Sequence, residues 1–352
     1  MSLTELSRHT GQWLRSGGPA GEVVISSRVR LARNLAGLPF LGRSTRSHQR
    51  ELEQRLWLEI LDSGVLGEGG FYVDVNAAGQ LDRELLVERH LISRHHADDD
   101  CPRGVAISAD ETVAIMVNEE DHIRMQVFRN GQQLDVAAAR INAIDDKLDE
   151  RLDFAFHGRY GYLTACPTNV GTGLRVSVML HLPALTLSGA IDKALRAAGD
   201  MHLAIRGLHG EGTAATGDFF QLSNQTTLGK TEQQIVEEFT DEVLPSFIDY
   251  ELSARDGLSR SQQALIDDRI FRAMATLKAA RVMSTREMMS LLSMVRLGVN
   301  IGKIDDVSLD TVNDMFLLAQ PAHLQKILGR TMTPDERAAA RADYIHKRLG
   351  VK

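Results

Sequence analysis

The sequence contains few cysteines, because only Cys101 and Cys166 occur among its 352 residues. It has no apolar run near the ~20 residues that a membrane-spanning helix needs. The N-terminal segment, MSLTELSRHTGQWLRSGG, has no apolar stretch followed by a small-residue cleavage site. These absences predict a soluble protein of the reducing cytoplasm with no membrane contact.

A block of basic residues is also absent. The chain carries 40 Lys and Arg against 47 Asp and Glu, a net charge of −7. Nucleic-acid binding depends on counterion release by clustered cations, so no nucleic-acid partner is expected. The sequence likewise lacks a Walker-type GxxxxGK[ST], a GxGxxG followed by VAIK, and HExxH, which argues against the common nucleotide-binding folds and the zincin metalloproteases.

Strand-like segments dominate the first two thirds of the chain. Residues 22–31, EVVISSRVRL, alternate so that Arg28 and Arg30 lie on one face of a strand. Residues 112–117 and 123–127 predict two further strands, joined by an acidic connection. The pattern indicates a sheet with one arginine-bearing face.

Helices are predicted over residues 47–62, over 132–152 from a three-and-four apolar spacing, and near 184–198. Residues 95–104, HHADDDCPRG, lack periodicity and predict a mobile loop. Three residue pairs form capping-box patterns: Thr231 with Gln234, Ser284 with Glu287, and Thr333 with Glu336.

The length predicts two domains, and beyond about residue 254 only helices are expected. The predicted organisation is a catalytic domain over residues 1–253 and a helical C-terminal domain over 254–352.

Five arginines fall on or at the end of predicted strands. They are Arg28, Arg30, Arg124, Arg175 and Arg206. Any one of them alone is typically a solvated or ion-paired surface residue. Together they favour a sheet face that converges on a polyanion such as a triphosphate.

Acidic candidates lie between two strands, at Glu119, Glu120 and Asp121, and in a glycine-rich loop, at Glu211. Adjacent acids are more often a solvated turn. The flanking apolar strands instead favour a sheet edge, where carboxylates could orient a guanidinium and take a proton from it. Cys166 precedes a glycine-containing loop, although a lone cysteine is usually a small buried hydrophobe.

Four segments together resemble the phosphagen (ATP:guanido) kinase family. They are SSRVRLARNLAGLPF, NEEDHIRMQ, CPTNVGTGLR and GEGTAATGDFFQLSNQTTLGKTE, in the family's order and spacing. Because SSRVR begins at residue 26, no room is expected for the helical N-terminal domain of creatine and arginine kinases. This detail and the helical C-terminal region resemble the bacterial protein-arginine-kinase branch.

The resemblance implies an α+β fold: a large antiparallel sheet flanked by helices, with a helical C-terminal domain. It implies catalytic roles for Glu120, Glu211 and Cys166, and ATP with Mg²⁺ held mainly by the nucleotide, without a dedicated protein metal site. The nucleotide-binding residues that it implies are Ser26, Ser27, Arg28, Val29, Arg30, His90, Arg124, Arg175, Val176, Ser177, Val178, Met179, Arg206, Gly207, Leu208, His209, Gly210 and Glu211.

Two positions depart from the family. Met179 stands where creatine and arginine kinases usually carry a histidine of the nucleotide site. The branch also carries an RDxxRA motif that binds phosphoarginine allosterically, here matched by residues 337–342, with Arg337 and Arg341 as its arginines. Ala338 replaces the motif's aspartate, so the carboxylate that would face the ligand's guanidinium is missing.

The predicted function is therefore phosphorylation of arginine residues in proteins by ATP, marking them for Clp-type proteolysis or altering regulators. The alternatives are a kinase for a free guanidino metabolite and an inactive adaptor that binds arginine or phosphoarginine. The resemblance further implies a set of partners: protein substrates with accessible arginines, a zinc-binding activator protein, Clp protease components, a heat-shock repressor and a second copy of the chain in a homodimer.

Overall fold

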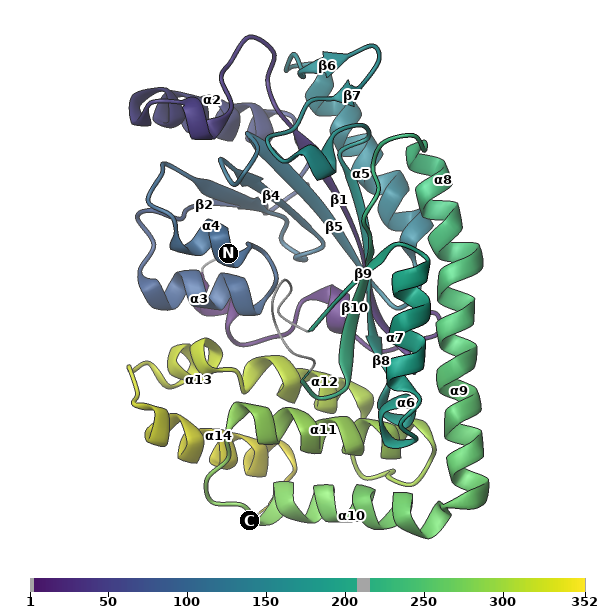
Figure 1. Cartoon of the computed structure of the whole chain (residues 1–352). Coiled ribbons are helices and arrows are strands. Elements are labelled where there is room, and N and C mark those ends of the chain that lie inside the picture. Colours follow the sequence, from purple (N-terminus) through teal and green to yellow (C-terminus); the bar gives the residue numbers. More distant parts are fainter. Residues whose placement is uncertain (1–2, 208–215, 352) are drawn as a thin grey trace.

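A computed structural model describes residues 3–207 and 216–351. Its centre is an eight-stranded sheet with the order β2-β3-β4-β5-β1-β8-β10-β9, and every neighbouring pair is antiparallel (Figure 1). Its strands are β1 (Val24–Arg33), β2 (Phe71–Asp74), β3 (Gly104–Ile107), β4 (Val113–Val117), β5 (Ile123–Asn130), β8 (Leu174–His181), β9 (Leu203–Arg206) and β10 (Phe219–Asn224). A separate hairpin pairs β6 (Phe156–His157) with β7 (Gly161–Tyr162). The predicted antiparallel α+β architecture is confirmed.

The two faces of the sheet differ, as the strand alternation predicts. On β1, Val29 and Leu31 are fully buried in the main core, where helices cover the sheet. Arg28 and Arg30 occupy the alternate positions and line a cleft on the other face. The helices of the core face are α2 (Arg46–Asp62), α5 (Leu134–Asp149), α7 (Ile191–Asp200), α8 (Glu232–Glu237) and α9 (Leu244–Ser261), with a π-helical turn at Glu238–Val243 between the last two.

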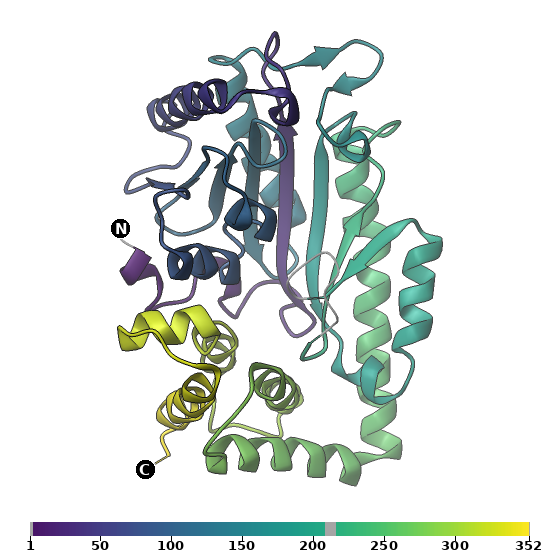
Figure 2. The same cartoon turned by 60° about the vertical axis from the view of Figure 1, so that its left-hand side comes forward.

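Shorter helices flank the cleft face. They are α1 (Leu3–Leu6), α3 (Gln80–Glu88) and α4 (Arg94–Asp98). The view in Figure 2 separates α3 and α4 on one side of the sheet from α8 and α9 on the other. Leu86 of α3 packs with Val105 of β3 in a smaller core, which also includes Leu91 in the turn after α3. The cleft face is therefore only partly covered.

The remaining helices follow the sheet domain in the chain. They are α6 (Pro183–Leu187), which lies between β8 and α7, and then α10 (Gln263–Ala279), α11 (Thr285–Asn300), α12 (Leu309–Leu318), α13 (Pro321–Leu328) and α14 (Pro334–Arg348). The last five share one core with residues of the sheet domain, including Trp13, Phe128 and Phe219. The predicted boundary after residue 253 falls within α9, and the two-domain division stays a prediction.

Contacts of α13 with the sheet domain are polar as well as apolar. The buried Glu88 of α3 accepts hydrogen bonds from the backbone N–H groups of Ala322 and His323, at 2.8 and 3.1 Å. The His323 ring Nδ1 lies 2.7 Å from the same carboxylate. This cap fixes the start of α13 beside the turn that carries His90.

Two local predictions were wrong. Residues 95–104 are not all loop, because α4 continues to Asp98 and β3 begins at Gly104. Ser93 caps α4 by accepting from the His96 N–H, and the His96 side chain is fully buried. The predicted helix near 184–198 is two helices, because Gly189 adopts a left-handed φ of 72° between α6 and α7. The predicted capping boxes at Thr231 and Thr333 are confirmed, whereas at Ser284 only the hydroxyl cap on the Glu287 N–H forms.

Among the described residues, none of the helices has the length and apolar character that crossing a membrane requires.

Candidate active site

A cleft of about 710 Å³ lies over the polar face of the central strands. All five predicted arginines line it, together with Glu120 and Cys166. The register explains this convergence, because Arg30 on β1 stands opposite Arg175 on β8, and Arg28 stands opposite Ser177. Arg124 comes from β5 and Arg206 ends β9. Residues nearly 180 positions apart in the chain thus meet at one surface.

The arginines are close enough to repel one another. Burial lowers the pKa of Arg28 to about 9, with further lowering by the charges of Arg124, Arg206 and Arg175. Burial, followed by the same kind of repulsion from Arg28 and the others, holds the pKa of Arg30 well below its usual range. Such repulsion is relieved when an anion binds between the guanidinium groups.

Arg30 gives the clearest indication that the cleft binds an anion. Its Nε and Nη2 atoms are buried, and no hydrogen-bond acceptor reaches them from the described parts of the chain. Arg28, by contrast, donates to Ser177 Oγ and to Gln221 Oε1, each at 3.2 Å. A buried donor without an acceptor costs about 1–3 kcal/mol, so the Arg30 geometry favours a bound phosphate.

The three adjacent acids have different surroundings. Glu119 is buried, lies 2.6 Å from Arg124 Nη1, and accepts from the Ser93 hydroxyl at 2.6 Å. Asp121 is buried and accepts from Asn34 Nδ2 and from the Ala165 N–H, both at 2.6 Å. Glu119 and Glu120 both line the cleft, but only Glu120 is half-buried. Glu119 and Asp121 therefore support the site, and Glu120 is the acid that can meet a substrate.

Glu120 also has the electrostatics of a base. Burial raises its pKa, and the neighbouring charges of Asp121 and Glu119 raise it further. A raised pKa makes a carboxylate a better proton acceptor, which suits removal of a proton from a guanidinium.

Glu119 has the opposite shift. Burial alone would raise its pKa, but the ion pair with Arg124 and the Ser93 hydrogen bond outweigh burial and lower it to about 2. Because the folded-state pKa lies below the ordinary value of ~4.3, Glu119 stabilises the fold above that value. The contribution is lost as the pH falls towards 2.

We expect Glu119→Gln to lower the free energy of unfolding at pH 7 by about 2–3 kcal/mol, since it leaves Arg124 without its carboxylate. Urea unfolding measured from pH 7 to pH 2 should show the difference from wild type shrinking below about pH 4. A difference that stays constant over this range would contradict the assigned ion pair.

Cys166 begins the short 3₁₀ turn Pro167–Asn169. Its Sγ lies 3.0 Å from the Thr168 hydroxyl. The preceding residue, Ala165, donates its backbone N–H to Asp121. The acidic segment thus holds the cysteine loop through Ala165, and Cys166 lines the same cleft as Glu120.

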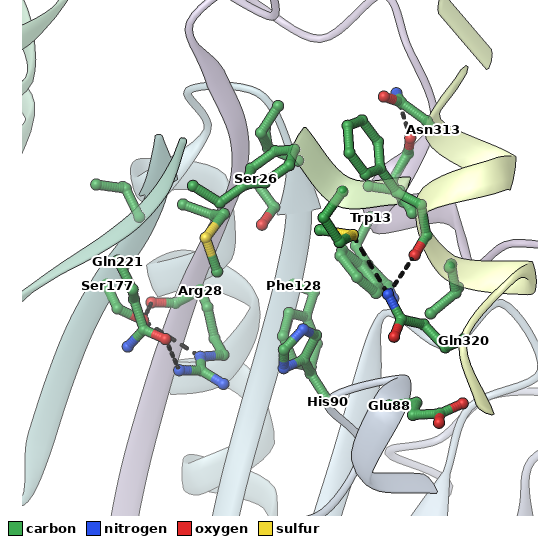
Figure 3. A pocket seen from close by; sticks show the side chains of 18 residues that line it. Trp13, Ser26, Arg28, Glu88, His90, Phe128, Ser177, Gln221, Asn313 and Gln320 are labelled. Atoms are coloured by element: carbon green, nitrogen blue, oxygen red, sulfur yellow. Dashed lines mark hydrogen bonds between the residues drawn. The ribbon is translucent and has the colours of Figure 1, made fainter. Parts of the chain in front are cut away.

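A second cavity adjoins the cleft and is lined mainly by apolar side chains. It shares Arg28, His90 and Gln221 with the cleft, and it is shown in Figure 3. His90 has a left-handed φ of 58° and meets the Trp13 ring edge to face at 5.5 Å. Ser26, Ser177, Val178 and Met179 of the predicted nucleotide site also line this cavity.

The other predicted nucleotide residues lie elsewhere. Ser27, Val29 and Val176 are fully buried, with Val29 and Val176 in the main core. Gly207 directly follows β9. Leu208, His209, Gly210 and Glu211 lie outside the described residues, so the pairing of Glu211 with Glu120 stays a prediction.

The two arginines of the altered RDxxRA motif donate to backbone carbonyls. Arg341 is buried and donates to the oxygens of Ala319 and Met283 at 3.0 and 2.8 Å. Arg337 donates to the Met332 oxygen at 2.7 Å. These bonds hold α14 against neighbouring segments, and the allosteric role stays a prediction.

Sequence reasoning missed several residues that shape the site. They are Trp13, Ser93, Phe128, Asn169, Gln221 and Gln320. Strand alternation along FFQLSN carried a weak signal for Gln221, whereas nothing local to Trp13 or Gln320 indicated a cavity.

Two family models match the chain. One, described as the ATP:guanido phosphotransferase C-terminal catalytic domain, matches residues 60–254, and the other, described as the protein-arginine kinase McsB C-terminal domain, matches residues 263–352. The protein-arginine kinase of Halothermothrix orenii is 41% identical over 352 residues, which is 100% of both chains. That of Bacillus subtilis is 40% identical over 338 residues, 96% of this chain and 93% of the relative.

The chain belongs to the protein-arginine kinase family. As a member of this family it is an ATP:guanidino phosphotransferase that phosphorylates arginine with ATP.

Solved structures of other guanidino kinases share the fold. A duplicated taurocyamine kinase from Schistosoma mansoni with bound transition-state-analogue components has a TM-score of 0.59 and 27% identity, over 72% of this chain and 36% of that one. A lombricine kinase has a TM-score of 0.56 and 28% identity, over 71% of both chains.

The family's use of ATP fits this cleft, since the unpaired Arg30 nitrogens and the clustered guanidinium groups suit a triphosphate. In the described residues, no group of three or more His, Cys, Asp and Glu side chains is arranged to hold a metal ion. Retention of Mg²⁺ mainly by the nucleotide stays a prediction.

Proposed function

We propose that the cleft transfers the γ-phosphoryl group of ATP to arginine side chains of other proteins. The observation that carries the proposal is the meeting of five arginines with Glu120 and Cys166 in a single cleft. The arginines provide positive charge for the phosphates, and the acid provides a site for the incoming guanidinium.

The reaction joins a guanidinium nitrogen of the substrate to the γ-phosphorus. The bond between that phosphorus and the bridging oxygen of ADP breaks, and ADP leaves with the bond's electron pair. The attacking nitrogen gives its proton to the Glu120 carboxylate. A guanidinium is a weak nucleophile because its lone pairs are delocalised, so orientation and proton removal by the acid lower the barrier.

The choice of protein arginine over a free guanidino metabolite is supported by the relatives, whose name is protein-arginine kinase. Glu120 and Cys166 line the cleft, and the β6–β7 hairpin, which precedes Cys166 in the chain, exposes the aromatic side chains of Phe156 and Tyr160. Contacts between this hairpin and the backbone flanking a target arginine would add binding energy that free arginine lacks.

The pure chain incubated with Mg-ATP and a denatured protein is expected to form acid-labile phosphoarginine on that protein. At equal arginine concentration, we expect the rate to exceed that for free arginine by at least about tenfold. Mass spectrometry under non-acidic conditions measures both products. Label only on free arginine would support the metabolite kinase, and no label on either would support the binding adaptor.

The wider cellular role belongs to the same proposal: marking proteins for Clp-type proteolysis or altering a heat-shock repressor, with activation by a zinc-binding protein and homodimerisation. A reducing cytoplasm is compatible with Cys101 and Cys166, which are both free thiols. The resemblance to the family is the support for these partners.

A further inference from the structure

The apolar cavity beside the cleft is built by both parts of the chain. Trp13, Phe128 and Phe219 come from the sheet domain and its N-terminal segment. Met289, Phe316, Leu317 and Gln320 come from α11, α12 and the start of α13. The C-terminal helices therefore form one wall of a cavity that opens towards the phosphate-binding arginines.

This arrangement orients a nucleotide. With the triphosphate on the arginines, as in the proposed function on which this inference rests, the nucleoside extends past Arg28 and His90, which both spaces share. A flat heterocycle then lies among aromatic and methionine side chains, where its burial is favourable. Polar atoms in such a cavity decide which heterocycle fits.

Gln320 has one polar atom to offer. Its Nε2 donates to the Phe316 carbonyl oxygen at 2.8 Å and contacts Met289 Sδ at 3.4 Å. Only the amide nitrogen can donate to a carbonyl, so this bond fixes which way the amide is turned. In Figure 3 both dashed lines from the Gln320 amide start at its nitrogen. The oxygen remains as an acceptor on a side chain that lines the cavity and is only 3% exposed.

Three other polar side chains of the cavity have partners, whereas the buried Trp13 Nε1 has no acceptor among the described residues. The Glu88 carboxylate accepts hydrogen bonds from the backbone N–H groups at the start of α13. Asn313 Nδ2 donates to the Leu14 oxygen at 2.9 Å, and Gln221 Oε1 accepts from Arg28. The Trp13 N–H can only donate, so the Gln320 oxygen is the acceptor placed to recognise an amino group of the base.

We infer that Gln320, supplied by the C-terminal domain, is a base-specificity residue whose oxygen accepts a hydrogen bond from the amino group of adenine. Guanine in the same orientation presents a carbonyl oxygen at that position. Two acceptors then face each other, and GTP is disfavoured.

The position of this oxygen depends on how the C-terminal helices dock. Gln320 immediately precedes α13, whose first turn is capped by Glu88, two residues from His90. The buried Arg341 donates to the oxygen of Ala319, the residue before Gln320. Base recognition therefore couples the two parts of the chain.

The test compares ATP with the triphosphate of purine riboside, which is adenosine without its amino group. For the wild type, we expect KM to be about 3- to 10-fold lower for ATP, the size of one net hydrogen bond. Gln320→Met keeps the side-chain length but removes the acceptor. In this variant, the KM for ATP should rise to the value for the purine riboside nucleotide, and discrimination against GTP should weaken.

Gln325→Met is the matched control. Gln325 lies on α13, is similarly buried, and bonds to Pro321 and Met332 rather than lining the cavity. This variant should keep the wild-type preference for ATP, even where its stability is reduced.

The outcomes separate two failures. A wild type that forms no phosphoarginine overturns the proposed function itself. An active wild type whose Gln320→Met variant still prefers ATP over the purine riboside nucleotide as strongly as before overturns the role of Gln320. Should the variant not fold, equal KM values of the wild type for those two nucleotides overturn the role as well.

Discussion

Glu120→Gln is expected to lower kcat for phosphoarginine formation by about 100-fold or more. The change removes the proton acceptor but keeps the size of the side chain. Among the described residues, Glu120 forms no ion pair with the five cleft arginines, in contrast to Glu119, whose carboxylate lies 2.6 Å from Arg124. ATP affinity should therefore change by less than about threefold, because the substitution leaves the contacts between the arginines and ATP unchanged. Initial rates and calorimetric titration with ATP measure the two quantities.

The pH dependence gives a second readout of Glu120. Its pKa is raised by burial and by the charges of Asp121 and Glu119. Since a base acts only when deprotonated, the wild-type rate should fall as the pH drops through this raised pKa, and Glu120→Gln should lack that limb.

The exposed Glu150 provides the control, since it lies at the end of α5, away from the cleft. Glu150→Gln should behave as wild type in both rate and pH dependence. A Glu120→Gln variant that keeps a third or more of the wild-type kcat would remove Glu120 from the mechanism.

Arg30→Met is expected to raise the free energy of unfolding by about 1–3 kcal/mol and to lower kcat/KM by about 100-fold or more. The buried Arg30 Nε and Nη2 have no acceptor among the described residues, and four other guanidinium groups repel its charge. Removing that charge removes the repulsion and the unpaired donors from the folded protein, which makes the fold more stable. Phosphoryl transfer should suffer because a contact to the triphosphate is lost. Urea unfolding without nucleotide and initial rates measure the two effects.

Arg33 on the same strand gives the opposite case. Its guanidinium lies 2.7 Å from the Asp145 carboxylate, stacks on the Tyr162 ring at 3.5 Å, and is fully buried. Arg33→Met leaves Asp145 buried without its cation, so it should destabilise the fold by about 3–5 kcal/mol. If Arg30→Met destabilises to a similar extent, then Arg30 is a structural arginine and the anion site is misassigned.

The sequence by itself determined the strands that carry the cleft arginines, the faces of those strands and the residue types of the site. Alternation along β1 separates Val29 and Leu31 from Arg28 and Arg30, because side chains of a strand point to opposite faces in turn. The capping boxes at Thr231 and Thr333 were also readable, since each depends on residues three apart. The motif spacing indicated the family, which the comparisons confirm.

Only the tertiary structure decided which of the three adjacent acids stays half-buried in the cleft and which two are held by protein partners. Glu119 and Asp121 find partners in Arg124, Ser93, Asn34 and Ala165, and the last three come from other elements of the chain. No local pattern records those partners. The order of residues 95–104 was hidden for the same reason, because it depends on burial of His96 against β3.

The apolar cavity was likewise invisible in the sequence. Trp13, Phe128, Phe219 and Gln320 are far apart in the chain and belong to four different elements or segments. Periodicity reports which face of one element is buried, but it carries no information on which distant element covers that face. Packing of the C-terminal helices against the end of the sheet supplies that information, and with it the wall of the cavity.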